Sequence, residues 1–174
     1  MISRNEWFIL VVSIFVVSLV LLGSYYLARA RRSSEETWES LLGRLMAVDR
    51  DNIAIIAADS DFDIEKSRIS SMIGGMSGLE ALESNCDVLI DLACHVQNYY
   101  PEALVIAEDL RLKAREIKWH LGRIKSISNS ENLQANFDDY ARRAISVYYR
   151  MTQNVLALYE RGNLPGLTEL RRAI

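Results

Sequence analysis

Residues 101–127 read PEALVIAEDLRLKAREIKWHLGRIKSI. Within this stretch, apolar residues recur at alternating steps of four and three, the spacing that places them on one side of an α-helix. This side consists of Ala103, Ala107, Leu110, Ala114, Ile117, Leu121 and Ile124. The alanines permit close approach of a neighbour, and Pro101 suits a first helical turn because it has no N–H to satisfy. The stretch therefore predicts a long helix packed along a near-antiparallel partner.

The preceding segment predicts that partner. Ser77-Gly-Leu-Glu80 has the pattern of a capping box, and the helix that it opens runs to about Tyr99. An αα-hairpin that turns near residue 100 then brings Asp87 near Lys113 and Glu83 near Lys118. These rim ion pairs contribute about 0–1 kcal/mol each, so we expect them to set register more than stability.

The segments farther out also follow helical spacing. Asn129-Ser130 is expected to cap a last long helix that ends at Gly162, and Pro165 is expected to start a final short helix. Upstream, Ser33-Ser-Glu-Glu36 is a second capping box, where a new helix starts or a helix from the preceding residues continues, and the apolar stripe that follows predicts helix to about residue 50. Residues 51–58 fit a helix or a short strand, and we expect a helix. Residues 64–73 predict a short helix that ends at Gly74-Gly75.

The fold class follows from these segments and from the composition. Half of the 174 residues are hydrophobic, and 8 Gly and 2 Pro are too few for the frequent turns of a sandwich or barrel. The sequence thus predicts an all-α chain with an antiparallel helical bundle of about four main helices plus short ones.

The apolar residues are concentrated near the start of the chain. Residues 7–28 carry no charge, and 14 of these 22 residues are Leu, Ile, Val or Phe. As a helix the segment spans ~33 Å, enough to cross a hydrocarbon core of about 30 Å. Trp7 at one end and Tyr25 and Tyr26 at the other suit the two headgroup layers. We interpret residues 7–28 as a transmembrane helix.

The flanking charges predict the orientation. Arg29, Arg31 and Arg32 follow the segment, whereas Arg4 before it is offset by Glu6. By the positive-inside rule, the N-terminus is expected outside and the C-terminal domain in the cytoplasm, with the chain held in the plasma (inner) membrane. A cleaved signal peptide is the alternative, because residues 28–30 read Ala-Arg-Ala, but the apolar run is longer than an ordinary h-region.

These observations give the expected domain organisation. Residues 1–6 form a short N-terminal tail, 7–28 the transmembrane helix, 29–34 a basic juxtamembrane linker, and 35–174 a soluble helical-bundle domain. Residues 33–174 hold 22 acidic and 16 basic residues. This balance argues against nucleic acid as a partner. Cys86 and Cys94 lie eight residues apart on one expected helix, too far apart for a disulfide, and are expected to be small core residues.

No catalytic or cofactor signature is evident. Asp59-Ser-Asp-Phe-Asp63 begins like a calcium loop, but the sixth position is Ile64 and the twelfth is Ser70, so the turn glycine and the closing glutamate are missing. Two carboxylate–histidine pairs, Asp91 with His95 and Glu116 with His120, suggest a di-metal bundle. The hairpin separates the histidines by ~22 Å along the axis, which favours surface helix pairs. We expect no enzyme activity, no metal and no cofactor.

The helix after Pro101 carries a second apolar side. Val105, Leu112 and Trp119 recur every seven residues opposite the first side. One explanation is that residues 35–73 cover them. The other is an exposed strip, flanked by Arg115 and Arg123, that contacts a partner. The last long helix has a similar second stripe, formed by Ile145, Tyr149 and Leu156.

The sequence therefore favours a single-pass membrane protein whose helical bundle acts as a protein-interaction, scaffold or accessory subunit of a membrane complex, with a protein partner or a homo-oligomer. The partner-contact residues of this hypothesis are Val105, Leu112, Arg115, Trp119 and Arg123. The alternative is a membrane-tethered signalling or sensor module that binds a small ligand within the bundle. An enzyme that uses the carboxylate–histidine pairs is a third and weaker hypothesis.

Overall fold

The computed structural model describes residues 7, 10, 12–21, 23, 24, 37–59, 64, 66–127 and 133–174. The chain divides into two compact units, residues 1–36 and residues 37–174, which are considered separately. The described residues contain helices and no strand, so the predicted all-α class is confirmed. The elements of the second unit are α2 (Trp38–Gly43), α3 (Arg50–Ala58), α4 (Lys66–Ile73), α5 (Gly75–His95), the 3₁₀ turn η1 (Val96–Asn98), α6 (Ala103–Ile127), α7 (Leu133–Arg161) and α8 (Leu167–Ala173).

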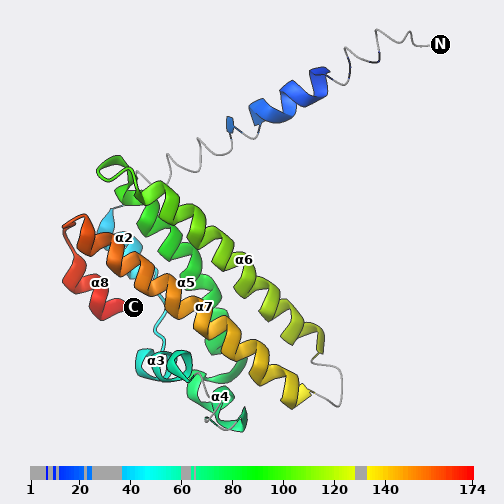
Figure 1. Ribbon diagram of the computed structural model, residues 1–174, viewed down its shortest axis with the longest axis vertical. Helices are drawn as coiled ribbons and strands as arrows, with labels where there is room; N and C mark the ends of the chain where they lie inside the picture. The colour runs from blue at the N-terminus through cyan, green and yellow to red at the C-terminus, as the bar shows by residue number, and fades with distance from the viewer. Residues whose placement is uncertain are drawn as a thin grey trace. The chain divides into compact units, whose positions relative to one another are not determined.

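Three long helices, α5, α6 and α7, run side by side and form the centre of this unit (Figure 1). The side of α6 predicted to face its neighbours does so, because all seven of its residues are at most 5% exposed. The α7 residues Ala144, Val147, Met151, Val155 and Leu158 are buried against them in the same core. The predicted packing side of α6 is therefore confirmed, and α7 packs against it.

The register of the α5–α6 hairpin differs from the prediction by about one helical turn. Lys118 Nζ lies 3.7 Å from Asp87 Oδ1, and Lys125 Nζ lies 3.3 Å from Glu80 Oε1. Lys113 pairs with Asp109 on its own helix instead of with Asp87. The prediction placed the reversal too early, because η1 extends the first arm and α6 begins at Ala103.

The predicted helix to residue 50 is wrong. α2 ends at Gly43, residues 45–49 are extended, and α3 starts anew at Arg50. Asp49 caps α3, since its carboxylate Oδ1 accepts a hydrogen bond of 3.0 Å from the Asn52 N–H. The expected helix over residues 51–58 is confirmed, but the part of the bundle that the structure describes has three long helices and not four.

Asn85, on α5, holds the extended segment against the core. Its side-chain nitrogen donates to the Met46 carbonyl at 2.9 Å, and its Oδ1 accepts from the Met46 N–H at 2.8 Å. The same nitrogen lies 3.3 Å from the hydroxyl of Tyr148 on α7. Asn85 and Tyr148 are each 1% exposed. One buried amide thus satisfies both backbone groups of Met46, in the way that a neighbouring strand would.

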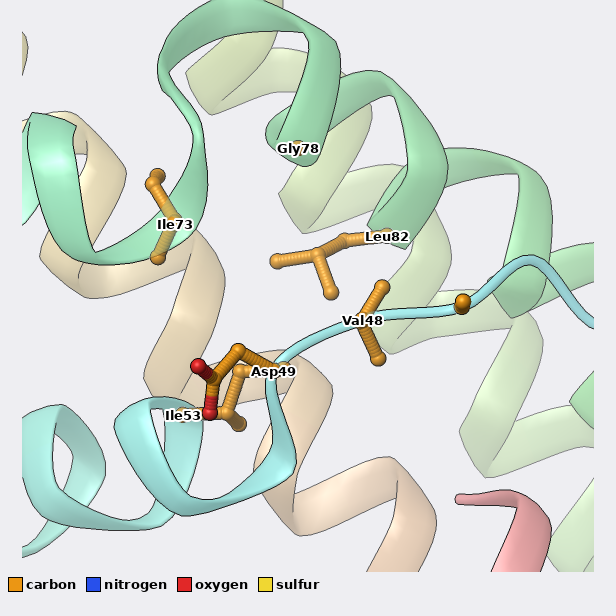
Figure 2. Close-up of a pocket in the computed structure, with 7 residues that line it drawn as sticks. Val48, Asp49, Ile53, Ile73, Gly78 and Leu82 are labelled. Atoms are coloured by element: carbon orange, nitrogen blue, oxygen red, sulfur yellow. The ribbon is translucent and has the colours of Figure 1, made fainter.

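The connection between α4 and α5 depends on glycine. Gly74 and Gly75 have φ angles of 76° and 67°, and α5 begins at Gly75, so the predicted capping box at Ser77 is wrong; Ser77 Oγ donates to the Gly74 carbonyl instead. A Cβ on Gly78 would lie 1.6 Å from the Ile73 carbonyl oxygen. Figure 2 shows Ile73 and Gly78 at a small cavity of about 90 Å³, with Val48 and Asp49 of the extended segment on its other side.

α7 is covered on two sides. α3, α4 and α8 contact α7, and Ile145 of its second apolar stripe is fully buried. Arg142 forms a buried ion pair with Asp59, and its Nη2 donates to the Ile64 carbonyl at 3.2 Å. The Asp59 carboxylate is therefore part of a packed contact and not of a solvated acidic loop; residues 60–63 lie outside the described residues.

The end of α7 differs in detail from the prediction. The residue after α7 that adopts a left-handed backbone conformation is Asn163, with φ of 45°, and not the expected terminal residue Gly162. Gly166, with φ of 83°, precedes α8, and a Cβ there would lie 2.5 Å from the indole ring of Trp38. Asn129-Ser130 and Ser33-Ser-Glu-Glu36, the two other predicted caps, lie outside the described residues.

The first unit is described in part. Residues 12–21 are helical, and their large apolar side chains are exposed, for example Phe15 at 63% and Val20 at 64%. Within the described residues, no helix combines the length and the apolarity that a bilayer crossing requires. Trp7 is helical and exposed, whereas the other predicted anchors, Tyr25, Tyr26, Arg29, Arg31 and Arg32, lie outside the described residues.

The Asn85 contact predicts the outcome of one substitution. Asn85→Leu keeps the branching of the side chain but removes both hydrogen bonds to Met46, so we expect the free energy of unfolding to fall by about 2 kcal/mol or more. Tyr148→Phe removes only the third, longer bond and should cost less than about 1 kcal/mol. Urea unfolding followed by circular dichroism measures both, and equal stability of Asn85→Leu and the parent chain would contradict this role.

A candidate interaction surface on α6

The second apolar side of α6 is exposed. Val105 is 72% exposed, Leu112 63% and Trp119 53%. α6 packs on α5, α7 and η1, whereas α2, α3, α4 and α8 make their main contacts with α5 or α7. The explanation that residues 35–73 cover this side of α6 is therefore wrong. We call Val105, Leu112 and Trp119, with the exposed Arg115 and Arg123, the α6 strip.

The α6 strip has the composition of a protein contact. Its residues come from one straight helix, so Val105, Leu112 and Trp119 lie in a row about 21 Å long. The Arg123 guanidinium carbon lies 5.2 Å from the centre of the Trp119 ring, a cation–π contact. Tyr140 of α7 meets the same indole edge to face, with centroids 5.9 Å apart. Trp119 is thus held in place while about half of its surface stays open.

His120 lies behind Trp119 and is buried. It is 4% exposed, its ring meets those of Trp119 and Tyr140 at 5.0 and 5.8 Å, and its Nε2 lies 3.8 Å from Glu116 Oε1. The interpretation of Glu116 and His120 as a surface pair is therefore wrong for the histidine. Burial lowers the pKa of His120, and the nearby Arg143 lowers it further, against the opposing effect of Glu116.

The charges beside the α6 strip are mainly acidic before Leu112 and mainly basic after it. Glu102, which precedes α6, and Glu108 are exposed before Leu112, whereas Arg115 and Arg123 are exposed after it, together with Glu116. Glu108 also pairs with Arg111 on its own helix. The two arginines were predicted from the sequence, whereas both glutamates, Tyr140 and the burial of His120 were not. The glutamates could have been identified from their spacing to Leu112. The contacts of Tyr140 with Trp119 and His120 could not, because they depend on how α7 packs against α6.

Other clusters offer weaker sites. No group of three metal-ligating side chains occurs within the described residues. Burial raises the pKa of the Cys86 thiol to about 12, so this cysteine is not a nucleophile at neutral pH. A groove of about 540 Å³ beside α7 is lined by three arginines and three carboxylates, among them the paired Arg142 and Asp59. This balance of charge gives the groove no preference for an anion.

Comparison of the chain with protein-family models, with curated proteins and with solved structures finds no match.

The environment of His120 predicts a pH dependence. Because its pKa is lowered by folding, the unfolded chain binds a proton more readily than the folded chain once the pH falls below about 6.5. The free energy of unfolding should therefore decrease as the pH falls from about 6.5 towards the folded-state pKa, and less so in His120→Gln. Urea titrations of both proteins between pH 7.5 and 5 measure the difference; parallel curves would contradict it.

Proposed function

We propose that this protein is a single-pass, membrane-anchored interaction module of the inner membrane, whose cytoplasmic helical bundle associates with a second copy of the same chain through the α6 strip. It acts as a scaffold or accessory subunit of a membrane complex and not as an enzyme. The single observation that carries the proposal is the exposed, charge-ordered apolar row on α6.

The sequence and the first unit support the anchor. An uncharged segment of 22 residues has the length and the insertion energy of a membrane span, an upper bound of about −4 to −8 kcal/mol from its Leu, Ile, Val and Phe residues. Residues 12–21 are helical and expose bulky apolar side chains, which are costly in water and favourable in lipid. The arginines at 29, 31 and 32 favour a cytoplasmic location for the bundle.

The order of side chains along α6 supports a second copy as the occupant. Leu112 is the middle residue of the apolar row, with Val105 seven residues before it and Trp119 seven residues after it. In an antiparallel pair of α6 helices centred on Leu112, Val105 of one copy lies opposite Trp119 of the other. Glu108 of one copy then lies near both Arg115 and Glu116 of the other, and Glu102 lies near Arg123, so the opposite-charge contacts are Glu108 with Arg115 and Glu102 with Arg123. In a parallel pair in register, each glutamate would instead face the same glutamate of the other copy, and each arginine the same arginine, so like charges would repel.

The anchor and the α6 strip act together in this proposal. A row of three large apolar residues and four charge pairs is a modest interface, typical of weak or transient association. Confinement of both copies to one bilayer raises their effective concentration, so a weak contact is sufficient. We expect Trp119, with Arg123 over its ring, to contribute most to the free energy of association, because interface centres favour Trp and Arg.

Charge reversal tests the proposed pairing. Glu108→Arg opposes two arginines across the pair, and Arg115→Glu opposes two glutamates, so each single variant should weaken self-association about tenfold or more. The double variant Glu108→Arg/Arg115→Glu restores opposite charges and should recover most of the affinity. Energy transfer between donor- and acceptor-labelled full-length chains in vesicles, at a fixed ratio of protein to lipid, measures the association.

Glu169→Arg, on α8, is the matched control and should leave the energy transfer unchanged. A double variant that associates no better than the single variants would contradict antiparallel pairing of α6. Absence of energy transfer in the parent chain would contradict self-association altogether.

The anchor has its own test. After expression of the full chain, alkaline carbonate washing should leave it in the membrane pellet, because an inserted helix is not released by the loss of ionic contacts. Placing two arginines in the apolar segment, at Val16 and Leu19, costs about 5–7 kcal/mol of insertion and should move much of the protein to the supernatant. Release of the unchanged chain by carbonate would rule out the anchor.

A further inference from the structure

The reversal between α5 and α6 exposes apolar side chains. Tyr99 is 78% exposed and Leu104 is 52% exposed. Residues 96–107 contain a single charged side chain, Glu102, whose carboxylate accepts a hydrogen bond of 2.6 Å from the Tyr100 hydroxyl. The reversal therefore presents one aromatic and one aliphatic side chain on a stretch of chain with little charge.

The start of the bundle lies at the same end of the molecule. Trp38 on α2 and Tyr99 line one cavity of about 240 Å³, together with Leu164 of the turn before α8. Figure 1 shows α2 and the reversal between α5 and α6 at the same end of the three long helices. Thr37, which precedes α2, therefore lies close to the reversal.

The length of chain before Thr37 limits how far this end can lie from the proposed anchor. Nine residues separate Ala28, the last residue of the apolar segment, from Thr37, so the chain between them spans at most about 32 Å. By comparison α6, with 25 residues, is about 37 Å long. The anchor thus keeps the reversal within reach of the bilayer surface and places no such limit on the opposite end of α6.

Lipid suits the exposed side chains of the reversal. Tyrosine is enriched where a bilayer meets water, because its ring is apolar and its hydroxyl stays hydrated. Leucine gains free energy when its side chain leaves water. Two such side chains bind a membrane weakly by themselves, but a short tether raises their effective concentration at the surface, so a weak contact is sufficient.

This contact leaves the α6 strip free for pairing. Leu104 lies about 100° around the helix from Val105. It shares its side of α6 with Arg111, whose Nη2 donates to Cys94 Sγ of α5 at 3.2 Å, so this side is the flank towards α5. The twofold axis of an antiparallel pair is perpendicular to both helices, so the α5 flanks of the two copies face the same way. Both copies can therefore place Leu104 against one bilayer.

We propose that the reversal between α5 and α6 docks on the lipid–water interface of the bilayer, with the Tyr99 ring and the Leu104 side chain inserted at the level of the headgroups. Docking rests on the membrane anchor of the proposed function but not on self-association.

A fluorescent dye at residue 104 reports this contact. Full-length Leu104→Cys is labelled with a maleimide dye, which leaves Cys86 and Cys94 unmodified because they are 0% and 4% exposed. The labelled chain is reconstituted into phosphatidylcholine vesicles at less than one chain per vesicle, which keeps copies apart. Lipids that carry a nitroxide on the headgroup then quench a dye at the interface.

Arg150→Cys is the matched reporter. Residue 150 is exposed on α7, in the groove that Glu116 lines on the other flank of α6. We expect the dye at residue 104 to be quenched about twofold or more strongly than the dye at residue 150, because a docked side chain lies within about 10 Å of the headgroups.

Two substitutions in the Leu104→Cys chain test the role of Tyr99. Tyr99→Asp places a charge at the interface and should lower the quenching to the level at residue 150. Ile55→Asp, on α3, is the matched control, because Ile55 is 53% exposed and lies outside the reversal. It should leave the quenching unchanged.

Flotation of the same vesicles separates docking from anchoring. Chains that float with the vesicles but show equal quenching at residues 104 and 150, or quenching that Tyr99→Asp leaves unchanged, would overturn docking while the anchor stands. Chains that do not float would contradict the anchor, and docking with it.

Discussion

The arrangement of the bundle depends on the hydrogen bonds between the Asn85 amide and the Met46 backbone. These bonds hold an extended segment against α5, where a continuing helix would have carried residues 45–58 in another direction. Because the chain is extended there, α3 lies against α7, where Arg142 and Asp59 complete the contact. The short helices before α5 consequently cover α7 and leave the outer side of α6 open.

Because α7 is covered and the outer side of α6 is open, only the second apolar stripe of α6 is exposed on the surface. Both helices carry a second apolar stripe, but Ile145 on α7 is fully buried and Val105, Leu112 and Trp119 on α6 are not. The exposed stripe is accompanied by glutamates towards one end and arginines towards the other. This order favours a partner with the same sequence in the opposite direction, which is why we propose a second copy.

The sequence predicted the parts of the fold that depend on local periodicity. The packing side of α6 was predicted residue by residue, since apolar residues on one side of a long helix recur at regular spacing. The break after Gly43 was not, because Leu41, Leu42, Leu45 and Val48 also fit a helix and the contact that stabilises the break comes from Asn85, distant in the sequence. The hairpin register was wrong because η1 adds length that periodicity does not show. The contact between the rings of Trp38 and Tyr159, with centroids 5.0 Å apart, was not predicted, since it joins α2 to the end of α7.

Cysteine cross-linking of full-length chains in vesicles tests the open, self-complementary α6 most directly. Antiparallel pairing centred on Leu112 predicts that Leu112→Cys cross-links to itself, and that Val105→Cys cross-links to Trp119→Cys when the two variants are mixed. Val105→Cys alone should give little product, because its two copies would lie about 21 Å apart along the paired helices. Efficient cross-linking of Val105→Cys to itself, or no cross-linking of Leu112→Cys, would contradict the account.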